Sequence, residues 1–154
     1  MTGSFALGGL PFAMYYLSNL LVVFPAGRLM DRVGRAPVLA LGHAAGACGA
    51  ASVALSLGAQ VGGGPLVLAS FLGGLFCVGA GWCLTYIPGS AILADATSFE
   101  ERGTLFGTND AVVSLFGATM TILAGFLYAG WGVLGLAFLG LGCGALPFAA
   151  AFAL

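Results

Sequence analysis

The chain alternates between long apolar stretches and short segments that are charged or rich in glycine. A bilayer core of about 30 Å is crossed by about 20 apolar residues in a helix that rises about 1.5 Å per residue. The apolar stretches predict five such spans, at residues 5–24, 37–57, 65–94, 104–128 and 131–153. The spans do not alternate in character at every second residue, as barrel strands do, so we expect five transmembrane α-helices.

Composition supports a membrane location. Hydrophobic residues make up 60% of the 154 residues and charged residues only 6%, whereas average globular composition includes about 25% charged residues. The mean hydropathy is +1.11. We therefore interpret residues 1–154 as a single all-α membrane domain in contact with the lipid bilayer. A net charge of −1 provides no long-range attraction for nucleic acid, and no nucleic-acid partner is expected.

Basic residues occupy two of the turns between spans. Arg28, Arg32 and Arg35 lie between the first two spans, and Arg102 lies between the third and fourth. Both turns face the same side when the spans alternate in direction. Because cytoplasmic loops carry the excess of basic residues, we expect these turns in the cytoplasm, the N-terminus outside and the C-terminus inside. The expected location is the cell membrane, which is the inner membrane in a bacterium.

The segment 25–39 has an ordered pattern rather than scattered charges. It reads Gly27-x-Leu29-x-Asp31-Arg32-x-Gly34-Arg35, with Leu39 four residues on. This pattern resembles the signature loop of the major facilitator superfamily of transporters, which joins the second and third helices of a half. The resemblance implies five helices of a six-helix half-bundle, with this loop as a latch that holds two halves together. The alternative is a plain topology signal, which any cytoplasmic loop provides.

Individual residues of this segment have physical roles that suit a latch. Gly27 allows a neighbouring helix to approach closely, and Gly34 permits a tight reversal. Asp31 is suited to accept hydrogen bonds from backbone N–H groups at a helix N-terminus. Pro25 together with Gly27 is expected to end the first helix. Ala36 departs from the family pattern, which usually has a second basic residue at this place.

A second informative segment covers residues 92–110. Asp95 ends the third span, and Glu101 and Arg102 lie in the following turn. This resembles the superfamily again, whose fourth helix of a half often ends in an acidic residue followed by Glu-Arg-Gly. We expect Arg32 or Arg35 to pair with Asp95, and a relay from Asp31 through the arginine to Asp95. The latch residues are then Gly27, Leu29, Asp31, Arg32, Gly34, Arg35, Asp95, Glu101 and Arg102.

Small residues predict where helices approach each other closely. Two sets recur at helical spacing, one in the second span and one in the third. They are Gly42, Gly46, Gly49 and Ser56, and Ser70, Gly74, Cys77 and Gly81. Small side chains at this spacing allow the backbones of two membrane helices to meet.

Asp110 is the only acidic residue that is expected inside a span. A charge in the bilayer must face protein or water, so Asp110 is a candidate proton carrier or cation contact. It belongs to a stripe of small and polar residues along one helix face, which we expect to line a cavity. The stripe consists of Gly103, Gly107, Asp110, Ser114, Gly117 and Thr121. The alternative is that Asn109 and Asp110 brace the cytoplasmic helix ends.

Four other polar or aromatic residues are candidates for a substrate or proton site. His43 is either a proton relay or a hydrogen-bonded packing residue. Asn19 either bonds to a neighbouring helix or contacts a substrate. Trp82 and Tyr86 share a helix face, which either packs on lipid and core or forms a cavity wall.

Several kinds of chemistry are disfavoured. The four cysteines form no Cys-x-x-Cys pair, so no disulfide, metal site or cofactor is expected. Ser90 and His43 do not indicate a hydrolase, because the serine lacks a Gly-x-Ser-x-Gly setting and no third residue orients the histidine. The chain contains no nucleotide-binding glycine loop and no lysine. We therefore expect a protein that is not an enzyme.

The leading hypothesis is a secondary active transporter that moves a small solute by alternating access, coupled to protons. The first span starts soon after Met1 and no long basic linker follows the last span. We therefore expect a truncated half whose partner is the missing half. Gly81-Trp82, the Glu-Arg-Gly turn and Gly107-x-Asn109-Asp110 resemble the second half of one bacterial subgroup, which implies helices eight to twelve. The alternative is an interaction subunit that packs against a separate half and transports nothing.

Overall fold

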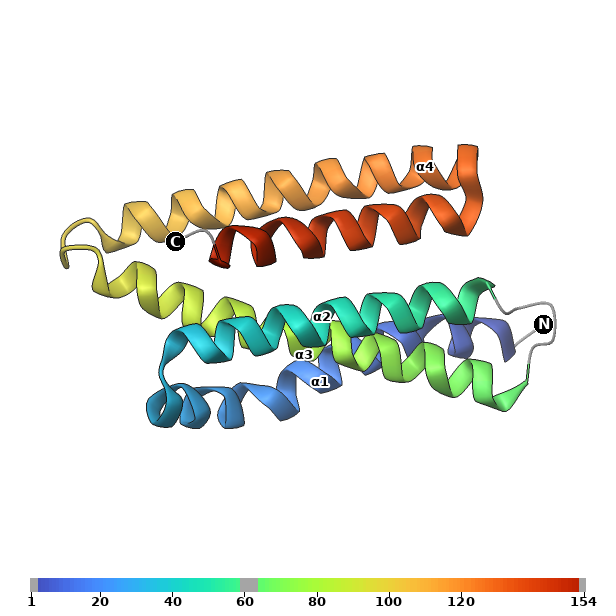
Figure 1. Ribbon diagram of the computed structural model, residues 1–154, viewed down its shortest axis with the longest axis horizontal. Coiled ribbons are helices and arrows are strands. Elements are labelled where there is room, and N and C mark those ends of the chain that lie inside the picture. Colours follow the sequence, from blue (N-terminus) through green and yellow to red (C-terminus); the bar gives the residue numbers. More distant parts are fainter. Residues whose placement is uncertain (1–2, 59–63, 153–154) are drawn as a thin grey trace.

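The fold consists of helices that run back and forth along one long axis (Figure 1). A computed structural model describes residues 3–58 and 64–152. The helices are α1 (Gly3–Val33), α2 (Arg35–Gly58), α3 (Pro65–Asp95) and α4 (Arg102–Phe152). No strand occurs in these two ranges, so the expected all-α class is confirmed.

The helix α4 contains two segments that are joined at Gly132. This glycine has φ 60 and ψ −143, which is not a helical conformation. The second segment runs back beside the first (Figure 1). The expected fourth and fifth spans therefore correspond to the two segments of α4, although residue 153 lies outside the described ranges. Within the described residues, four helical stretches are long and apolar enough to cross a membrane: Gly9–Val33, Arg35–Gly58, Pro65–Asp95 and Arg102–Gly132.

The expectation that Pro25 and Gly27 end the first helix is wrong. The helix α1 continues to Val33 and contains Pro11 and Pro25 in its interior. A helix of 31 residues is about 46 Å long, which exceeds the bilayer core of about 30 Å. The segment that carries Arg28, Asp31 and Arg32 is therefore an extension of the helix rather than a loop.

The chain reverses direction between α1 and α2 at a single residue. Gly34 has φ 87, a left-handed conformation that glycine adopts without steric cost. Its backbone N–H donates a hydrogen bond of 3.0 Å to the carbonyl of Met30. The predicted tight reversal at Gly34 is confirmed.

The most extensive packing is between α2 and α3. A Cβ atom added to Gly81 would lie 2.6 Å from the backbone nitrogen of Gly46 and 2.7 Å from the carbonyl oxygen of Gly42. A Cβ atom added to Gly49 would lie 2.6 Å from the carbonyl oxygen of Gly74. The backbones of α2 and α3 therefore meet at the small residues, as their spacing predicted. Larger side chains at these positions would push the two helices apart. The Ser52 hydroxyl also donates to the Ser70 carbonyl at 3.0 Å, which links the two helices.

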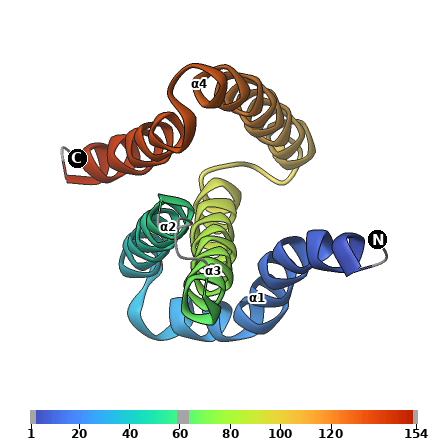
Figure 2. The ribbon, with the colours of Figure 1, turned by 90° about the vertical axis from the view of Figure 1, so that its right-hand side faces the viewer.

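The other helices flank this pair. The helix α1 packs on α3 at a point where Gly79 leaves room for the buried Ser18. The second segment of α4 packs on α2, while the first segment stands away from α3 (Figure 2). None of residues 102–132 is buried. The first segment of α4 therefore contacts its own second segment, for example through Met120 and Cys143, more than it contacts α3 (Figure 1).

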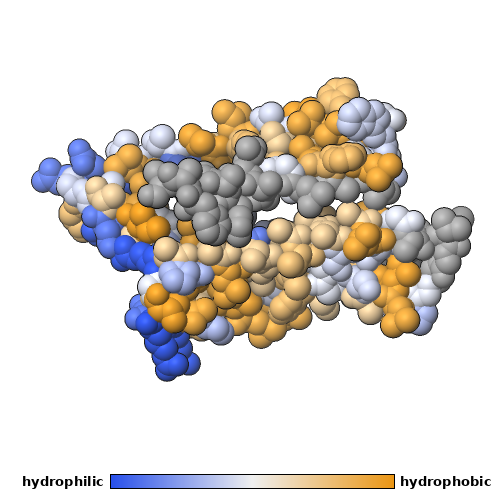
Figure 3. All heavy atoms as spheres, viewed as in Figure 1, coloured by the Kyte–Doolittle hydropathy of each residue, from blue (hydrophilic) through white to orange (hydrophobic). Residues whose placement is uncertain are grey.

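Charged residues gather at one end of the molecule. Figure 3 shows the hydrophilic residues in blue at the end where α1 meets α2 and α3 meets α4, with apolar residues along most of the remaining length. Just inside this end, Ala26, Val38 and Leu84 form a buried apolar cluster against which Leu29 packs. This cluster holds α1, α2 and α3 together next to the charged turns.

Candidate functional site

An ion pair joins the two charged turns. Arg35 is the first residue of α2 and Asp95 is the last residue of α3. The Arg35 guanidinium contacts the Asp95 carboxylate, and the two side chains are 37% and 61% exposed. Of the two arginines that sequence reasoning offered for Asp95, the structure selects Arg35. The predicted pairing across the turns is confirmed.

The charge of Asp95 is stabilised by its surroundings. The helix α3 has 31 residues and a length of about 46 Å, so its charged end extends beyond the bilayer core. A hydrogen bond from Arg35 is the main reason why the pKa of the Asp95 carboxyl is lowered, and the charges of Arg35 and Arg102 act in the same direction. The contribution of the pair is complete above the ordinary pKa of the carboxyl and is lost as pH falls through the lowered pKa. The pair is therefore charged at neutral pH.

The expected relay from Asp31 to Asp95 does not form in the described structure. Among residues 3–58 and 64–152, the only ion pair is the one between Arg35 and Asp95. Asp31 and Arg35 are four positions apart, a spacing that brings side chains together only on a continuous helix. Gly34 interrupts the helix between them. Asp31 and Arg32 are exposed on the last turns of α1 instead.

The expected close approach of a helix to Gly27 is also not found within this chain. A Cβ atom added to Gly27 would meet nothing within 4 Å. Leu29, two residues on, packs on the apolar cluster of Ala26, Val38 and Leu84. The leucine therefore anchors the end of α1 while the glycine lies on an open part of the surface.

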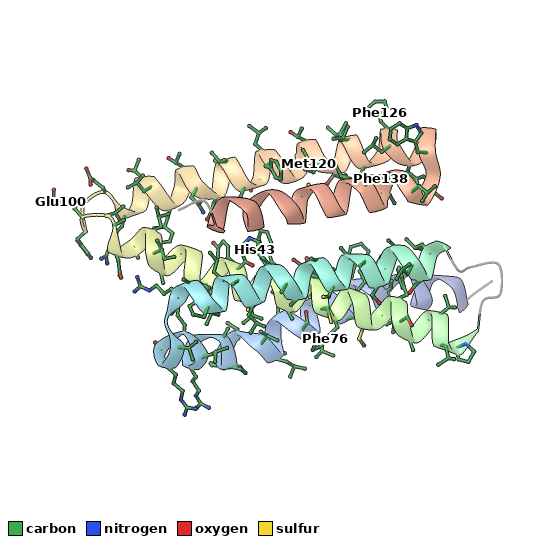
Figure 4. The ribbon with its side chains drawn as sticks, in the orientation of Figure 1. His43, Phe76, Glu100, Met120, Phe126 and Phe138 are labelled. Atoms are coloured by element: carbon green, nitrogen blue, oxygen red, sulfur yellow. The ribbon has the colours of Figure 1, made fainter. Side chains whose placement is uncertain are left out.

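The acidic turn before α4 is organised by a serine. The Ser98 hydroxyl donates to a carboxylate oxygen of Glu101 at 2.9 Å, and the Ser98 carbonyl accepts the backbone N–H of Arg102. A carboxylate at a helix N-terminus interacts favourably with the helix dipole. Glu101 thus stabilises the start of α4, whereas Glu100 projects outward at the tip of the turn (Figure 4). Ser98 was not among the predicted site residues, although Ser-x-x-Glu before a helix is a capping signal that marks it in the sequence.

A cavity of about 630 Å³ lies between α3 and the first segment of α4. Trp82, Tyr86 and Ser90 line it from α3, among others, and Asn109, Val112, Val113 and Phe116 line it from α4. Trp82 and Tyr86 are therefore in a cavity wall, which is one of the two alternatives that their spacing left open. Their rings are stacked, with centroids 5.8 Å apart and an angle of 15° between the planes.

The expected stripe on α4 is not the face that lines this cavity. Ser114 is exposed and does not contribute to the lining. The lining residues Asn109, Val112 and Phe116 follow one another at helical spacing on an adjacent face. The reason is the rotation of α4 about its own axis, which the sequence pattern alone does not fix.

Asp110 lies at the edge of the cavity and contacts its wall. The Tyr86 hydroxyl donates to one carboxylate oxygen of Asp110 at 3.3 Å, and the Asn109 amide donates to the same oxygen at 3.4 Å. The Tyr86 bond connects α3 to α4, so Asp110 braces the two helices at this point. The structure thus joins three predicted site residues, Asp110, Asn109 and Tyr86, in one cluster.

The side chains of His43 and Asn19 form hydrogen bonds with backbone carbonyls of their own helices. The ring nitrogen Nδ1 of His43, which Figure 4 labels on α2, donates to the Leu39 carbonyl at 2.8 Å. The Asn19 amide donates to the Tyr15 carbonyl at 2.9 Å. These bonds match the packing role given as one alternative for His43. For Asn19 the partner is its own helix rather than the neighbouring helix that we expected.

The architecture defines the class of this protein. Long apolar helices, backbone contact through glycine and charges concentrated at one end are the features of a multi-pass α-helical membrane protein. Residues 2–154 match the family model of the Major Facilitator Superfamily, and the chain belongs to this family of transporters. A search of curated proteins and a search of solved structures each found no match.

Proposed function

We propose that this chain works as part of a secondary active transporter that moves a small solute across the cell membrane by alternating access. The observation that carries the proposal is the Arg35–Asp95 ion pair between the two charged turns, in a chain of a transporter family. An exposed pair adds little to stability. The pair joins the first residue of α2 to the last residue of α3, so its role in this proposal is to hold the two charged turns together in one state of the cycle and to separate them in the other.

The surface of α1 at the same charged end is suited to contact with a second half-bundle. Gly27 and Asp31 are four residues apart on α1, so they share one helix face. A Cβ atom added to Gly27 would meet nothing within 4 Å among the described residues, and Asp31 is exposed. A helix of a second half would approach closely at Gly27, and its N-terminal N–H groups would bind Asp31. The latch then consists of this contact together with the Arg35–Asp95 pair.

The proposed topology follows from the distribution of charge. The charged turns are cytoplasmic because all four basic residues lie at that end. The N-terminus is then outside and the C-terminus inside. In this proposal the chain corresponds to helices eight to twelve of a transporter, and the first segment of α4, which is not buried here, is covered by lipid and the other half.

Proton coupling is assigned to Asp110. Its carboxylate lies on a segment long and apolar enough to cross the membrane and has no cationic partner among the described residues. Carboxylates within membrane spans mark ion pathways and proton relays in transporters. Replacement by asparagine would remove the carboxylate and leave the shape of the side chain intact.

The test is solute flux into liposomes that contain the purified chain, with and without a second half expressed from the same source. A panel of amino acids, sugars, organic acids and organic cations would be presented with and without an imposed proton gradient. We expect gradient-driven accumulation of at least one solute, and loss of the gradient dependence in Asp110→Asn. Uptake that depends equally on the gradient in Asp110→Asn would contradict proton coupling through this residue.

The latch has its own test, on the solute that the panel identifies. Arg35→Glu places two carboxylates together and should slow the cycle, whereas Arg35→Glu combined with Asp95→Arg should restore the rate. Unchanged flux in the single variant would rule out a gating role for the pair. The alternative is a non-transporting interaction subunit, which the unburied first segment of α4 favours. Absence of flux for every solute, with and without the second half, would support that alternative.

A further inference from the structure

We propose that the cavity between α3 and the first segment of α4 binds an organic monocation with an apolar body, such as a tertiary or quaternary ammonium compound. The role of this compound as the transported substrate rests on the proposed function, but its binding does not. Three features of the cavity carry the inference: an aromatic pair, a carboxylate without a cationic partner, and an apolar lining.

The aromatic pair offers ring faces to a cation. Trp82 and Tyr86 both line the cavity and are partly exposed to it. Their ring centroids are 5.8 Å apart, and each ring turns only one of its two faces toward the other ring. A cation within about 6 Å of a ring centroid is attracted by the negative face of the ring, most strongly for tryptophan. A pair of stacked rings therefore forms a platform for an ammonium group.

The carboxylate of Asp110 supplies the matching charge. Both of its hydrogen bonds, from Tyr86 and Asn109, reach the same oxygen, Oδ1. No described hydrogen bond or ion pair reaches the second oxygen, Oδ2, within residues 3–58 and 64–152. Because the Tyr86 hydroxyl bonds Asp110 directly, the charge lies at the edge of the aromatic platform. A charge in an apolar surrounding without a partner is costly, and a bound cation would offset that cost.

The rest of the lining favours an apolar body and excludes anions. Val112, Val113 and Phe116 face the cavity from α4, and Ile92 and Leu93 face it from α3. No arginine is among the lining residues, so nothing in the cavity compensates an anionic group. A volume of about 630 Å³ is within the range of about 300–1,000 Å³ that is typical of sites for drug-sized ligands.

The experiment compares a cation with an uncharged compound of the same shape. Phenyltrimethylammonium and tert-butylbenzene differ in the charged nitrogen alone. Binding to the full chain in detergent would be measured by equilibrium dialysis with radiolabelled compounds. In a Trp131→Phe background Trp82 is the sole tryptophan, so quenching of its fluorescence reports binding at the aromatic pair.

We expect the cation to bind more than about tenfold more tightly than its neutral counterpart, because both the cation–π contact and the carboxylate favour the charged compound. Asp110→Asn should lower the affinity for the cation by about tenfold or more and leave tert-butylbenzene unaffected. Asp110→Glu should retain most of the affinity. Glu100→Gln is the matched control, because it removes an acidic residue outside the cavity and should change neither affinity.

Equal affinity for the two compounds, or an unchanged cation affinity in Asp110→Asn, would overturn the proposal. If Asp110→Asn loses helicity by circular dichroism, Trp82→Leu replaces it and should weaken cation binding by about 3- to 30-fold. Cation binding without flux would support the binding site and would contradict only the transport proposal. Flux of an uncharged solute together with no cation binding supports transport and rejects this site.

Discussion

At the scale of single residues, Gly34 shows how one backbone conformation organises the charged end. With φ 87 it reverses the chain within one residue, so Arg35 becomes the first residue of α2 and reaches Asp95. The same reversal separates Arg35 from Asp31. A non-glycine residue at this point pays about 1–2 kcal/mol for the left-handed conformation.

We predict that Gly34→Ala lowers the free energy of unfolding by about 1–2 kcal/mol, whereas Gly34→Asn lowers it less, because asparagine tolerates this conformation better. The measurement is unfolding of the purified chain in detergent, followed by circular dichroism. Gly27→Ala is the control, since a Cβ atom there meets nothing within 4 Å, and its stability should not fall. Equal stability of the alanine and asparagine variants at position 34 would contradict the backbone argument.

At the scale of elements, α2 and α3 form the rigid part of the structure. Their backbones touch through Gly42, Gly49, Gly74 and Gly81. By contrast, the first segment of α4 makes few contacts with α3, and the cavity lies between them. A motion that opens or closes this cavity therefore moves the first segment of α4 relative to a fixed α2–α3 pair.

We predict that Gly81→Ala lowers the free energy of unfolding by about 1–3 kcal/mol, the usual cost of overpacking. The added Cβ would lie 2.6 and 2.7 Å from backbone atoms of α2, which cannot move aside as a flexible side chain would. Gly73→Ala on the same helix is the matched control, because nothing lies within 4 Å of its Cβ. It should be neutral or gain up to about 1 kcal/mol from helix propensity. Equal effects of the two variants would show that the α2–α3 contact is not close.

At the scale of the whole molecule, every charged side chain except Asp110 lies in or next to the two turns at one end, and apolar residues cover most of the remaining length in the view of Figure 3. Without a charge at the opposite end, the chain has one strong signal for its orientation in the membrane. The Arg35–Asp95 pair shows that both charged turns lie on the same side. In the proposed topology this side faces the cytoplasm, in line with the positive-inside rule.

We predict that a membrane-impermeant maleimide labels Gly58→Cys from outside intact cells and labels Glu100→Cys only after the membrane is opened. Both variants would be made in a background from which the four native cysteines have been removed. Glu100 and Gly58 are both exposed, and the turn between α3 and α4, which contains Glu100, lies at the opposite end of the structure from the C-terminal end of α2, where Gly58 is the last residue (Figure 1). Labelling of Glu100→Cys in intact cells would invert the proposed topology.

The sequence by itself determined the properties that depend on composition and local spacing. Apolar length and the absence of period-two alternation determined an all-helical membrane fold, because backbone groups in lipid must bond within their own helix. Small residues at helical spacing determined which faces of α2 and α3 meet. The two charged turns determined that Asp95 would have an arginine partner, because both had to leave the bilayer on one side.

Only the tertiary structure decided the properties that depend on how helices are rotated and where they stop. The sequence pattern did not show that α1 would continue past Pro25, that Gly34 would separate Asp31 from Arg35, or that the face of α4 with Asn109 and Phe116 would line the cavity. The physical reason is that a helix with apolar residues all round has no marked inner face. Its rotation is set by contacts with residues that are distant in the chain.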